Sequence, residues 1–79
     1  MKTNARQPSP AIIAARKEVG AKLREIRERR GLTTSDVANI VEIDRATVSK
    51  LESANWSPTL DQVLRIAAAI GVRLEIIEE

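Results

Sequence analysis

Large apolar side chains recur at helical spacing along residues 10–30, namely Ile12, Val19, Leu23 and Ile26. Ser9 followed by Pro10 is typical of a helix start, because the serine hydroxyl caps the first turn and proline fits its first position. Gly20 interrupts the pattern and weakens a helix by up to about 1 kcal/mol. The segment therefore forms either one long helix or two short ones.

Basic residues and a glycine mark the end of that segment, and a second helix follows closely. Arg29 and Arg30 suit the negative end of a helix, and Gly31 suits the position just after it. Thr33 then begins the second helix, with Asp36 three residues later as its capping-box partner. The expected apolar face of this helix is Val37, Ala38, Ile40 and Val41.

A third helix begins almost immediately after the second. Asp44 is its expected N-cap, and Val48 and Leu51 are expected to point inward. Only Glu42 and Ile43 separate the two helices. Helices joined by so tight a turn must cross at a steep angle, so this pair predicts a helix-turn-helix.

A fourth helix is predicted beyond Ser57-Pro58, which interrupts the chain. Thr59 and Gln62 form a second capping box, and Gly71 ends the helix. Its expected buried stripe is Leu60, Val63, Leu64, Ala67 and Ile70. Up to this glycine the chain is expected to be all-α.

Apolar and charged residues alternate over most of residues 72–79, which predicts a short β-strand. The rest of the sequence offers no second strand, and an unpaired strand leaves its backbone groups unsatisfied. We therefore expect Val72, Leu74 and Ile76 to meet their own copies across the two-fold axis of a homodimer. The alternative is a frayed, extended tail.

The composition narrows the chemistry that is open to the chain. Its 79 residues form one domain at most, and a domain of that size is marginally stable alone. It has no cysteine and no histidine, so it lacks soft metal ligands and the common nucleophile–base pairs of enzymes. We expect no cofactor, no metal and no catalytic activity.

The charge is small in total but unevenly distributed. Residues 1–50 carry 11 Lys/Arg against 6 Asp/Glu, whereas residues 51–79 carry 2 against 5. A basic first half suits a polyanion, although a solvated surface with uneven charge explains the asymmetry equally well. No apolar run is long enough for a membrane span or a signal peptide, so the cytoplasm is the expected location.

The helix-turn-helix pattern covers residues 34–53. Ala38 stands where the second and third helices would meet most closely, and a small residue is needed at such a crossing. Branched or long apolar residues occupy the inward positions around it, namely Val37, Val41, Ile43, Val48 and Leu51. A helical scaffold without a DNA role is the alternative, because a fold alone does not prove a function.

These residues resemble the phage repressor and Cro family, also called the Xre family, over about residues 20–72. The matching stretches are Gly31-Leu32-Thr33, Val37-Ala38, Arg45 to Glu52, Ser57 to Leu60, Ile66-Ala67 and Ala69 to Val72. The resemblance implies a lambda-repressor-like, all-α bundle of four to five helices over residues 10–71, after a flexible arm at 1–9. The strand at 72–79 resembles that of HipB-type antitoxin repressors, whose C-terminal strands pair across the dimer.

The same resemblance implies that residues 44–53 form the recognition helix, which enters the major groove. The helical pattern by itself turns four side chains outward, namely Arg45, Ala46, Ser49 and Lys50. Arg45 and Lys50 have the chemistry to donate to guanine O6 and N7, and Ala46 to touch a thymine methyl. Ser49 suits either a base or the backbone. We expect Arg45 to read a base, and a solvated surface arginine is the alternative.

Phosphate contacts are expected where helices begin, because free amides and the helix dipole attract anions there. Thr34 and Ser35 start the second helix, although the resembling family usually has the longer glutamine in place of Thr34. The resemblance assigns further backbone contacts to Thr47, Ser53 and Asn55. Asn55 suits a left-handed helix cap equally well.

Three further residues have structural or open roles. The resemblance implies an ion pair between Arg27 and Glu52, which ties the first helix to the recognition helix. Glu42 stands where the family usually has glycine, and a left-handed backbone there costs about 1–2 kcal/mol. Trp56, the only aromatic residue, either covers the small core, contacts the DNA backbone or anchors a dimer.

These patterns predict a sequence-specific DNA-binding transcriptional regulator, most simply a dimeric repressor on a near-palindromic operator. Its expected partners are double-stranded DNA and a second copy of itself. The alternative is an antitoxin that acts mainly by covering a toxin protein. That role needs an exposed apolar patch, for which Ile12, Ile13 and Ile77 are the candidates.

Overall fold

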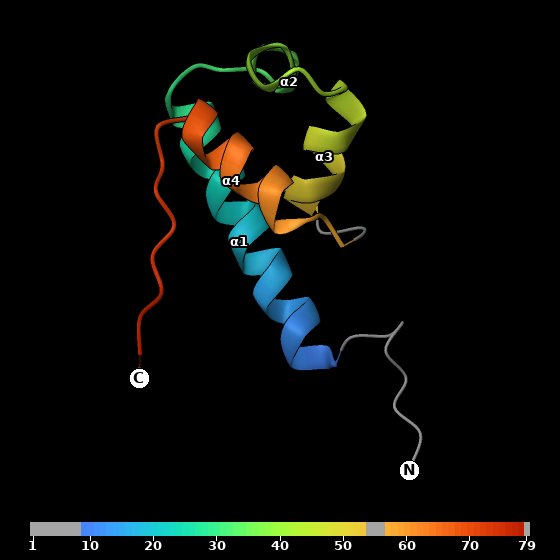
Figure 1. Cartoon of the computed structure of the whole chain (residues 1–79), viewed down its shortest axis with the longest axis vertical. Coiled ribbons are helices and arrows are strands. Elements are labelled where there is room, and N and C mark those ends of the chain that lie inside the picture. Colours follow the sequence, from blue (N-terminus) through green and yellow to red (C-terminus); the bar gives the residue numbers. More distant parts are fainter. Residues whose placement is uncertain (1–8, 54–56, 79) are drawn as a thin grey trace.

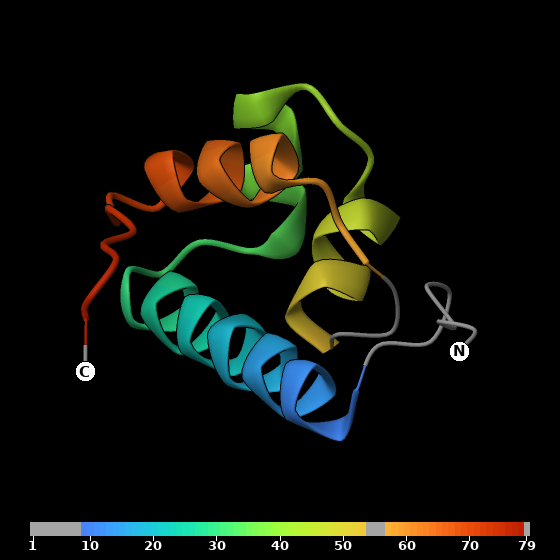
Figure 2. The same cartoon turned by 60° about the horizontal axis from the view of Figure 1, so that its bottom comes forward.

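The protein's structure, a computed structural model, describes residues 9–53 and 57–78. Within them the chain forms four α-helices: α1 (Pro10–Arg29), α2 (Thr34–Val41), α3 (Arg45–Ser53) and α4 (Leu60–Ala69). The long α1 runs diagonally through the molecule, and the three shorter helices gather around its C-terminal part (Figure 1). In a second view, α2, α3 and α4 all lie on one side of α1 (Figure 2).

Side-chain caps fix the starts of three helices where the sequence predicts them. The Ser9 hydroxyl accepts a hydrogen bond from the Ile12 amide at 3.3 Å, and Pro10 follows as the first residue of α1. Thr33 and Asp36 form a capping box at α2, and an equivalent box opens α4. Each cap satisfies amides that have no partner within their own helix.

Helices α1, α2 and α4 end in the same way, with a left-handed residue followed by a backbone hydrogen bond across the last turn. Gly31 has φ of +74° and Gly71 has φ of +79°, and each follows its helix directly after the C-cap residue. The next amide in each case reaches back to a carbonyl of the last turn, as in the bond from Val72 to Ala67 at 2.8 Å. Glu42 adopts the left-handed conformation after α2, with φ of 60° and ψ of 45°, so a non-glycine residue takes the strained backbone here.

The core is small and consists of aliphatic residues from all four helices. The fully buried members are Leu23, Val37, Ala38, Val48, Leu51, Ile66, Ala67 and Ile70. The stripe expected on α4 was partly wrong, because Leu60 is 70% exposed and Leu64 is 44% exposed. Ile66 is buried in their place, and Ile40 of α2, which was expected to face inward, is also exposed. Apolar residues of α4 lie on most sides of this helix, so their spacing alone does not predict which side is buried.

The first segment is one continuous helix, and Gly20 has a role in it that the sequence pattern did not reveal. A Cβ atom on Gly20 would lie 2.6 Å from the Glu52 carbonyl oxygen and 2.7 Å from that of Leu51. Contacts that short cannot hold a methyl group, so α1 and the end of α3 approach as closely as they do because residue 20 is glycine.

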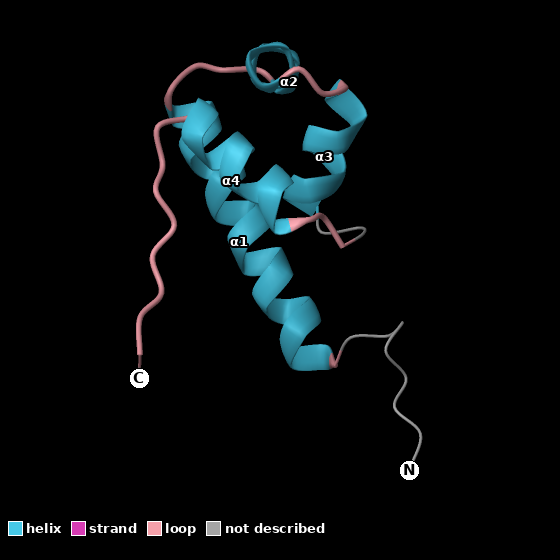
Figure 3. Cartoon of the chain, viewed as in Figure 1, coloured by secondary structure: helices cyan, strands magenta, loops and turns pink. Residues whose placement is uncertain are grey.

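The strand expected at residues 72–79 is not seen. Residues 72–78 follow α4 as chain without regular secondary structure, and no strand is present in the described part of the molecule (Figure 3). A strand needs a neighbour for its backbone groups, and the described part of a single chain offers none. In the same described residues, no helix combines the length and apolarity needed to cross a membrane.

Candidate nucleic-acid interface

The turn between α2 and α3 is held by hydrogen bonds around Asp44. Its Oδ1 accepts from the Thr47 amide at 2.8 Å and from the Thr47 hydroxyl at 2.7 Å. These two bonds, the hydroxyl's first, hold the pKa of Asp44 below its ordinary value. The turn closes with a bond from the Ile43 amide to the Ala38 carbonyl at 3.0 Å. Asp44 therefore caps the start of α3, next to Arg45, while the Ile43 bond closes the end of α2.

Five of the predicted DNA-contacting side chains share one shallow hollow on the surface. The hollow has a volume of about 500 Å³ and is lined by Thr34, Arg45, Ala46, Ser49 and Lys50. All four of the α3 residues are exposed, and Thr34 is half-buried at the start of α2. The structure thus brings the first turn of α2 and the outward face of α3 together on a single surface.

The cations of this surface are available to an anion. Within residues 9–53 and 57–78, the ion pairs of the protein involve neither Arg45 nor Lys50. Both α2 and α3 also begin here, and the amides of a first helical turn carry partial positive charge. The hollow therefore combines two free cations with two helix N-termini, which suits the phosphates and guanine edges of DNA.

The remaining predicted contact residues are placed less clearly. Thr47 is half-buried and its hydroxyl is engaged by Asp44, so its observed role is to cap α3. The Ser53 hydroxyl donates to the Lys50 carbonyl at 3.2 Å, and Ser35 is exposed on the first turn of α2. Asn55 and Trp56 lie outside the described residues, as do residues 1–8 of the arm predicted at 1–9, whereas Ser9 caps α1.

Arg27 and Glu52 form a bidentate ion pair in the interior. Arg27 Nε donates to Glu52 Oε2 at 2.6 Å, and its second guanidinium nitrogen donates to Oε1 at 3.0 Å. A third bond runs from Arg27 to the Leu32 carbonyl at 2.7 Å. The two side chains are only 10% and 7% exposed. The hydrogen bond to Glu52 raises the pKa of Arg27 against the opposing effect of burial.

Arg27 and Gly20 attach α1 to the same end of α3. Glu52 receives the guanidinium through its side chain, while its carbonyl oxygen lies against Gly20. The two α1 residues are seven positions apart and therefore lie on one face of the helix. This spacing could have revealed the role of Gly20 from the sequence. Gly20 lies inside a predicted helix, on the same face as Arg27, and Arg27 was expected to pair with Glu52 of the third helix.

One contact was not expected from the sequence, and a predicted one affects a pKa. Arg16 of α1 donates to the Ser57 hydroxyl at 2.6 Å, which connects α1 to the segment that leads into α4. In the predicted capping box of α2, Asp36 accepts from the Thr33 amide at 2.8 Å, and this bond and the Thr33 hydroxyl lower the pKa of Asp36. Among the described residues, no cluster of acidic, histidine or cysteine side chains has the arrangement of a metal site.

The sequence is similar to known helix-turn-helix proteins. Residues 18–78 match the family described as the helix-turn-helix domain. A relative from Methanothermobacter thermautotrophicus is 41% identical over 49 residues, which is 62% of this chain and 71% of the relative. That relative carries the name of an uncharacterized HTH-type transcriptional regulator.

Proposed function

The chain belongs to the family of helix-turn-helix domains, and we propose that it is a dimeric, sequence-specific transcriptional repressor. A DNA-binding role in transcription regulation follows from the family and from the relative's name. The observation that carries the proposal further is the hollow shared by Thr34 and the four outward residues of α3. A family of regulators also agrees with the expectation that the chain is not an enzyme.

In the proposed complex, α3 lies in the major groove with its N-terminal half toward the bases. Arg45 and Lys50 are exposed and outside the ion pairs of the described chain, so each can donate to guanine O6 and N7 without first breaking a bond. Ala46 offers a methyl group to thymine, and Ser49 offers a hydroxyl to a base or the backbone. Thr34 and Ser35 would place the amides of α2 on a phosphate.

The proposed mechanism of repression is steric. A two-fold dimer presents two recognition helices about 34 Å apart, which matches successive major grooves on one side of a near-palindromic site. A protein bound across such a site blocks access of the polymerase. We assign the dimer contact to the tail at 72–79. Val72 already packs against its own core, so the available contacts come from Leu74 and Ile76. Resemblance to the Xre family and to the HipB type supports this assignment.

Selection of a random DNA library on the purified protein at about physiological salt tests the proposal, because non-specific binding is weak there. We expect enrichment of a two-fold symmetric site whose half-site spacing is about one helical turn. A library that shows no enriched sequence, with weak and strongly salt-dependent binding throughout, contradicts a sequence-specific repressor. The Arg45→Ala variant, run in parallel, is expected to lose preference at one base pair of each half-site.

A second candidate function is supported by exposed apolar residues away from α3. Ile12 and Ile77 are exposed, as a toxin-covering antitoxin would require, whereas Ile13 is half-buried. In that case the protein's main partner is another protein, and DNA binding is secondary. The same library selection separates the two functions, because an antitoxin without operator binding enriches no symmetric site.

A further inference from the structure

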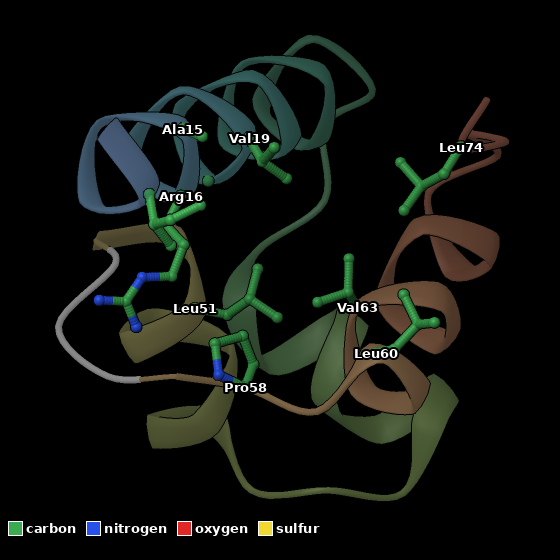
Figure 4. Close-up of a pocket in the computed structure, with 10 residues that line it drawn as sticks. Ala15, Arg16, Val19, Leu51, Pro58, Leu60, Val63 and Leu74 are labelled. Atoms are coloured by element: carbon green, nitrogen blue, oxygen red, sulfur yellow. The ribbon is translucent and has the colours of Figure 1, made fainter. Parts of the chain in front are cut away.

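An apolar groove opens between α1, the end of α3, the start of α4 and the chain that follows α4 (Figure 4). Its volume is about 380 Å³, more than twice that of an engineered cavity of about 150 Å³ that binds benzene. By that measure the groove has room for roughly 10–15 non-hydrogen atoms of a ligand. Its volume also falls within the range of about 300–1,000 Å³ in which proteins bind small molecules.

The lining of the groove is apolar except at one point. Nine of its ten lining residues are apolar or glycine, and the tenth is Arg16. Val19, Leu51 and Val63 lie around its middle, whereas Arg16 and Leu74 lie at opposite ends (Figure 4). A lining of this kind suits an elongated apolar molecule with a single polar group at one end, because a few polar contacts fix the orientation of a ligand.

The guanidinium of Arg16 has unused hydrogen-bond donors. Within the described chain it makes one hydrogen bond, from Nη1 to the Ser57 hydroxyl at 2.6 Å. Its Nε is buried and has no hydrogen-bond partner among the described residues, whose ion pairs do not include Arg16 either. A buried donor without an acceptor is rare and costs stability, so this edge of the guanidinium is where we expect the polar group of a ligand to bind.

Arg27, about three turns further along the same helix, shows what this edge of a guanidinium binds. Its Nε and Nη2 donate to the two carboxylate oxygens of Glu52, at 2.6 Å and 3.0 Å. These two nitrogens form a planar fork that matches the spacing of carboxylate oxygens. In the described part of the molecule, the corresponding fork of Arg16 has no carboxylate.

We propose that the groove is a binding site for a small, apolar carboxylic acid. Its carboxylate pairs with the Nε–Nη2 fork of Arg16, and its hydrocarbon chain lies along Val19, Leu51 and Val63. The arginine side chain has several rotatable bonds, so the fork can turn toward the groove when the carboxylate arrives.

The charge of the lining selects a carboxylate over other polar groups. One guanidinium balances one negative charge, and no second cation lines the groove. A phosphate monoester carries up to about two negative charges and would leave one of them unpaired in apolar surroundings. An alcohol accepts only a neutral hydrogen bond, which is weaker than the charge-assisted pair, and an amine is repelled by the guanidinium.

The groove is separate from the DNA-facing hollow. None of the five residues of that hollow lines the groove. Its site goes beyond the proposed function and does not depend on it. Arg45 and Lys50 are nevertheless exposed cations, so a test has to distinguish a carboxylate bound at Arg16 from one bound at the hollow.

Calorimetric titration of the purified protein with octanoate, 1-octanol and octylammonium tests the ligand class. These ligands share one hydrocarbon chain, and octanoate has about ten non-hydrogen atoms, which the groove can hold. We expect octanoate to bind one site per chain with a Kd of about 0.1–1 mM, and at least about tenfold more tightly than the other two. Equal affinities for octanoate and 1-octanol, or no saturation by octanoate below about 10 mM, overturn the proposal.

The length of the carboxylic acid tests the volume of the groove. From butanoate to octanoate, each added methylene is expected to tighten binding by up to about fourfold, because it becomes buried. The gain should end once the ligand exceeds roughly 10–15 non-hydrogen atoms. Affinity that keeps rising at the same rate through tetradecanoate and hexadecanoate indicates adsorption to the surface, and it contradicts a site of this size.

Substitutions on α1 locate the site. Arg16→Met keeps an apolar side chain but removes the fork, and is expected to weaken octanoate about tenfold without changing 1-octanol. Ala15→Phe fills the groove and is expected to abolish binding of both ligands. The matched controls are Lys17→Met, which removes a charge, and Ala14→Phe, which adds a ring. Both controls alter exposed residues of α1 outside the groove and should change either affinity less than twofold.

Thermal melts provide a second readout and show that each variant is folded. Ala14, Ala15 and Lys17 are exposed, so their replacement should leave the fold intact. A ligand that binds the folded state raises Tm, and octanoate is expected to do so in the wild type but not in Ala15→Phe. Octanoate binding that survives Ala15→Phe, or that Arg16→Met and Lys17→Met weaken equally, overturns the proposal. None of these measurements includes DNA, so they stand whether or not the DNA selection enriches a site.

Discussion

Replacing Gly20 by alanine sets two physical effects against each other in one experiment. Alanine is the best helix former and glycine is among the worst, so at an exposed site the change would stabilise α1 by about 1 kcal/mol. At this site the added Cβ would lie 2.6 Å from the Glu52 carbonyl oxygen. An unstrained carbon–oxygen contact is about 3.3 Å or longer, so the helices must separate by about 0.7 Å.

The atoms that the new methyl group meets are backbone atoms, which cannot rotate away. Overpacking of this kind costs about 1–3 kcal/mol, which exceeds the gain in helix propensity over most of that range. We therefore expect Gly20→Ala to lower the free energy of unfolding by about 1 kcal/mol. In a domain of this size that loss lowers Tm by about 4–8 °C.

Thermal and denaturant unfolding measure this effect, with Ala21→Gly as the matched control. Ala21 is the next residue of α1 and is exposed, so its replacement reports the ordinary cost of glycine, about 1 kcal/mol. We expect both variants to be less stable than the wild type, although they change the glycine content in opposite directions. A Gly20→Ala protein with a raised Tm would refute the reasoning. Specific DNA affinity should also fall for this variant where it remains folded, because Gly20 lies against α3, the proposed recognition helix.

Three further predictions concern the interface and its supports. Arg45→Ala should weaken operator binding by about 1–3 kcal/mol and relax preference at one base pair, as measured by repeating the library selection; unchanged preference removes Arg45 from base reading. Arg27→Ala should cost about 3 kcal/mol of stability, because it leaves the Glu52 carboxylate buried without its partner, whereas Arg27→Met with Glu52→Leu should recover most of it in denaturant titrations. Asp44 has a lowered folded-state pKa, so its contribution to stability is complete above the unfolded value of about 3.9 and is lost as the pH falls through the folded value. Melts between about pH 6 and pH 2 should show a steeper acid loss in the wild type than in Asp44→Asn, and parallel curves would contradict the capping role.

The ends of the helices were predictable because their signals are local. Ser9, Thr33 and Thr59 each stand directly before a helix and hydrogen-bond to an amide three residues later. Gly31 and Gly71 each supply the left-handed backbone that follows a helix. None of these interactions depends on how the helices pack, so the sequence next to each boundary was sufficient.

The buried face of α4 was harder to predict, because it depends on packing between helices. Leu60, Leu64 and Ile66 are all apolar, and the spacing of such residues gives a period without selecting one face. Packing in the shared core buries Ile66 and leaves the two leucines exposed. The strand predicted at 72–79 depends in the same way on a partner, and a single chain does not provide one.

For the candidate site, the sequence was sufficient to predict which side chains of α3 share a surface. Arg45, Ala46, Ser49 and Lys50 do so because they occupy one face of one helix. The addition of Thr34 depends on the angle between two helices, and the short turn with its left-handed Glu42 sets that angle. Thr47 belongs to the same helix, but its hydroxyl donates to Asp44 and so takes part in the cap of α3. The helical pattern does not separate Thr47 from the outward residues, because the difference lies in this hydrogen bond.

The supports of the recognition helix are distributed in a way that suits its proposed task. Gly20 and Arg27 both engage Glu52, near the C-terminal end of α3, and Asp44 holds the opposite end through Thr47. Neither attachment uses a side chain from the hollow. The outward residues are therefore free to differ between related proteins without loss of the fold, since specificity and stability depend on separate residues. That separation holds only if α1 keeps its distance from α3, which makes Gly20 as important for the position of the DNA-facing surface as the buried ion pair.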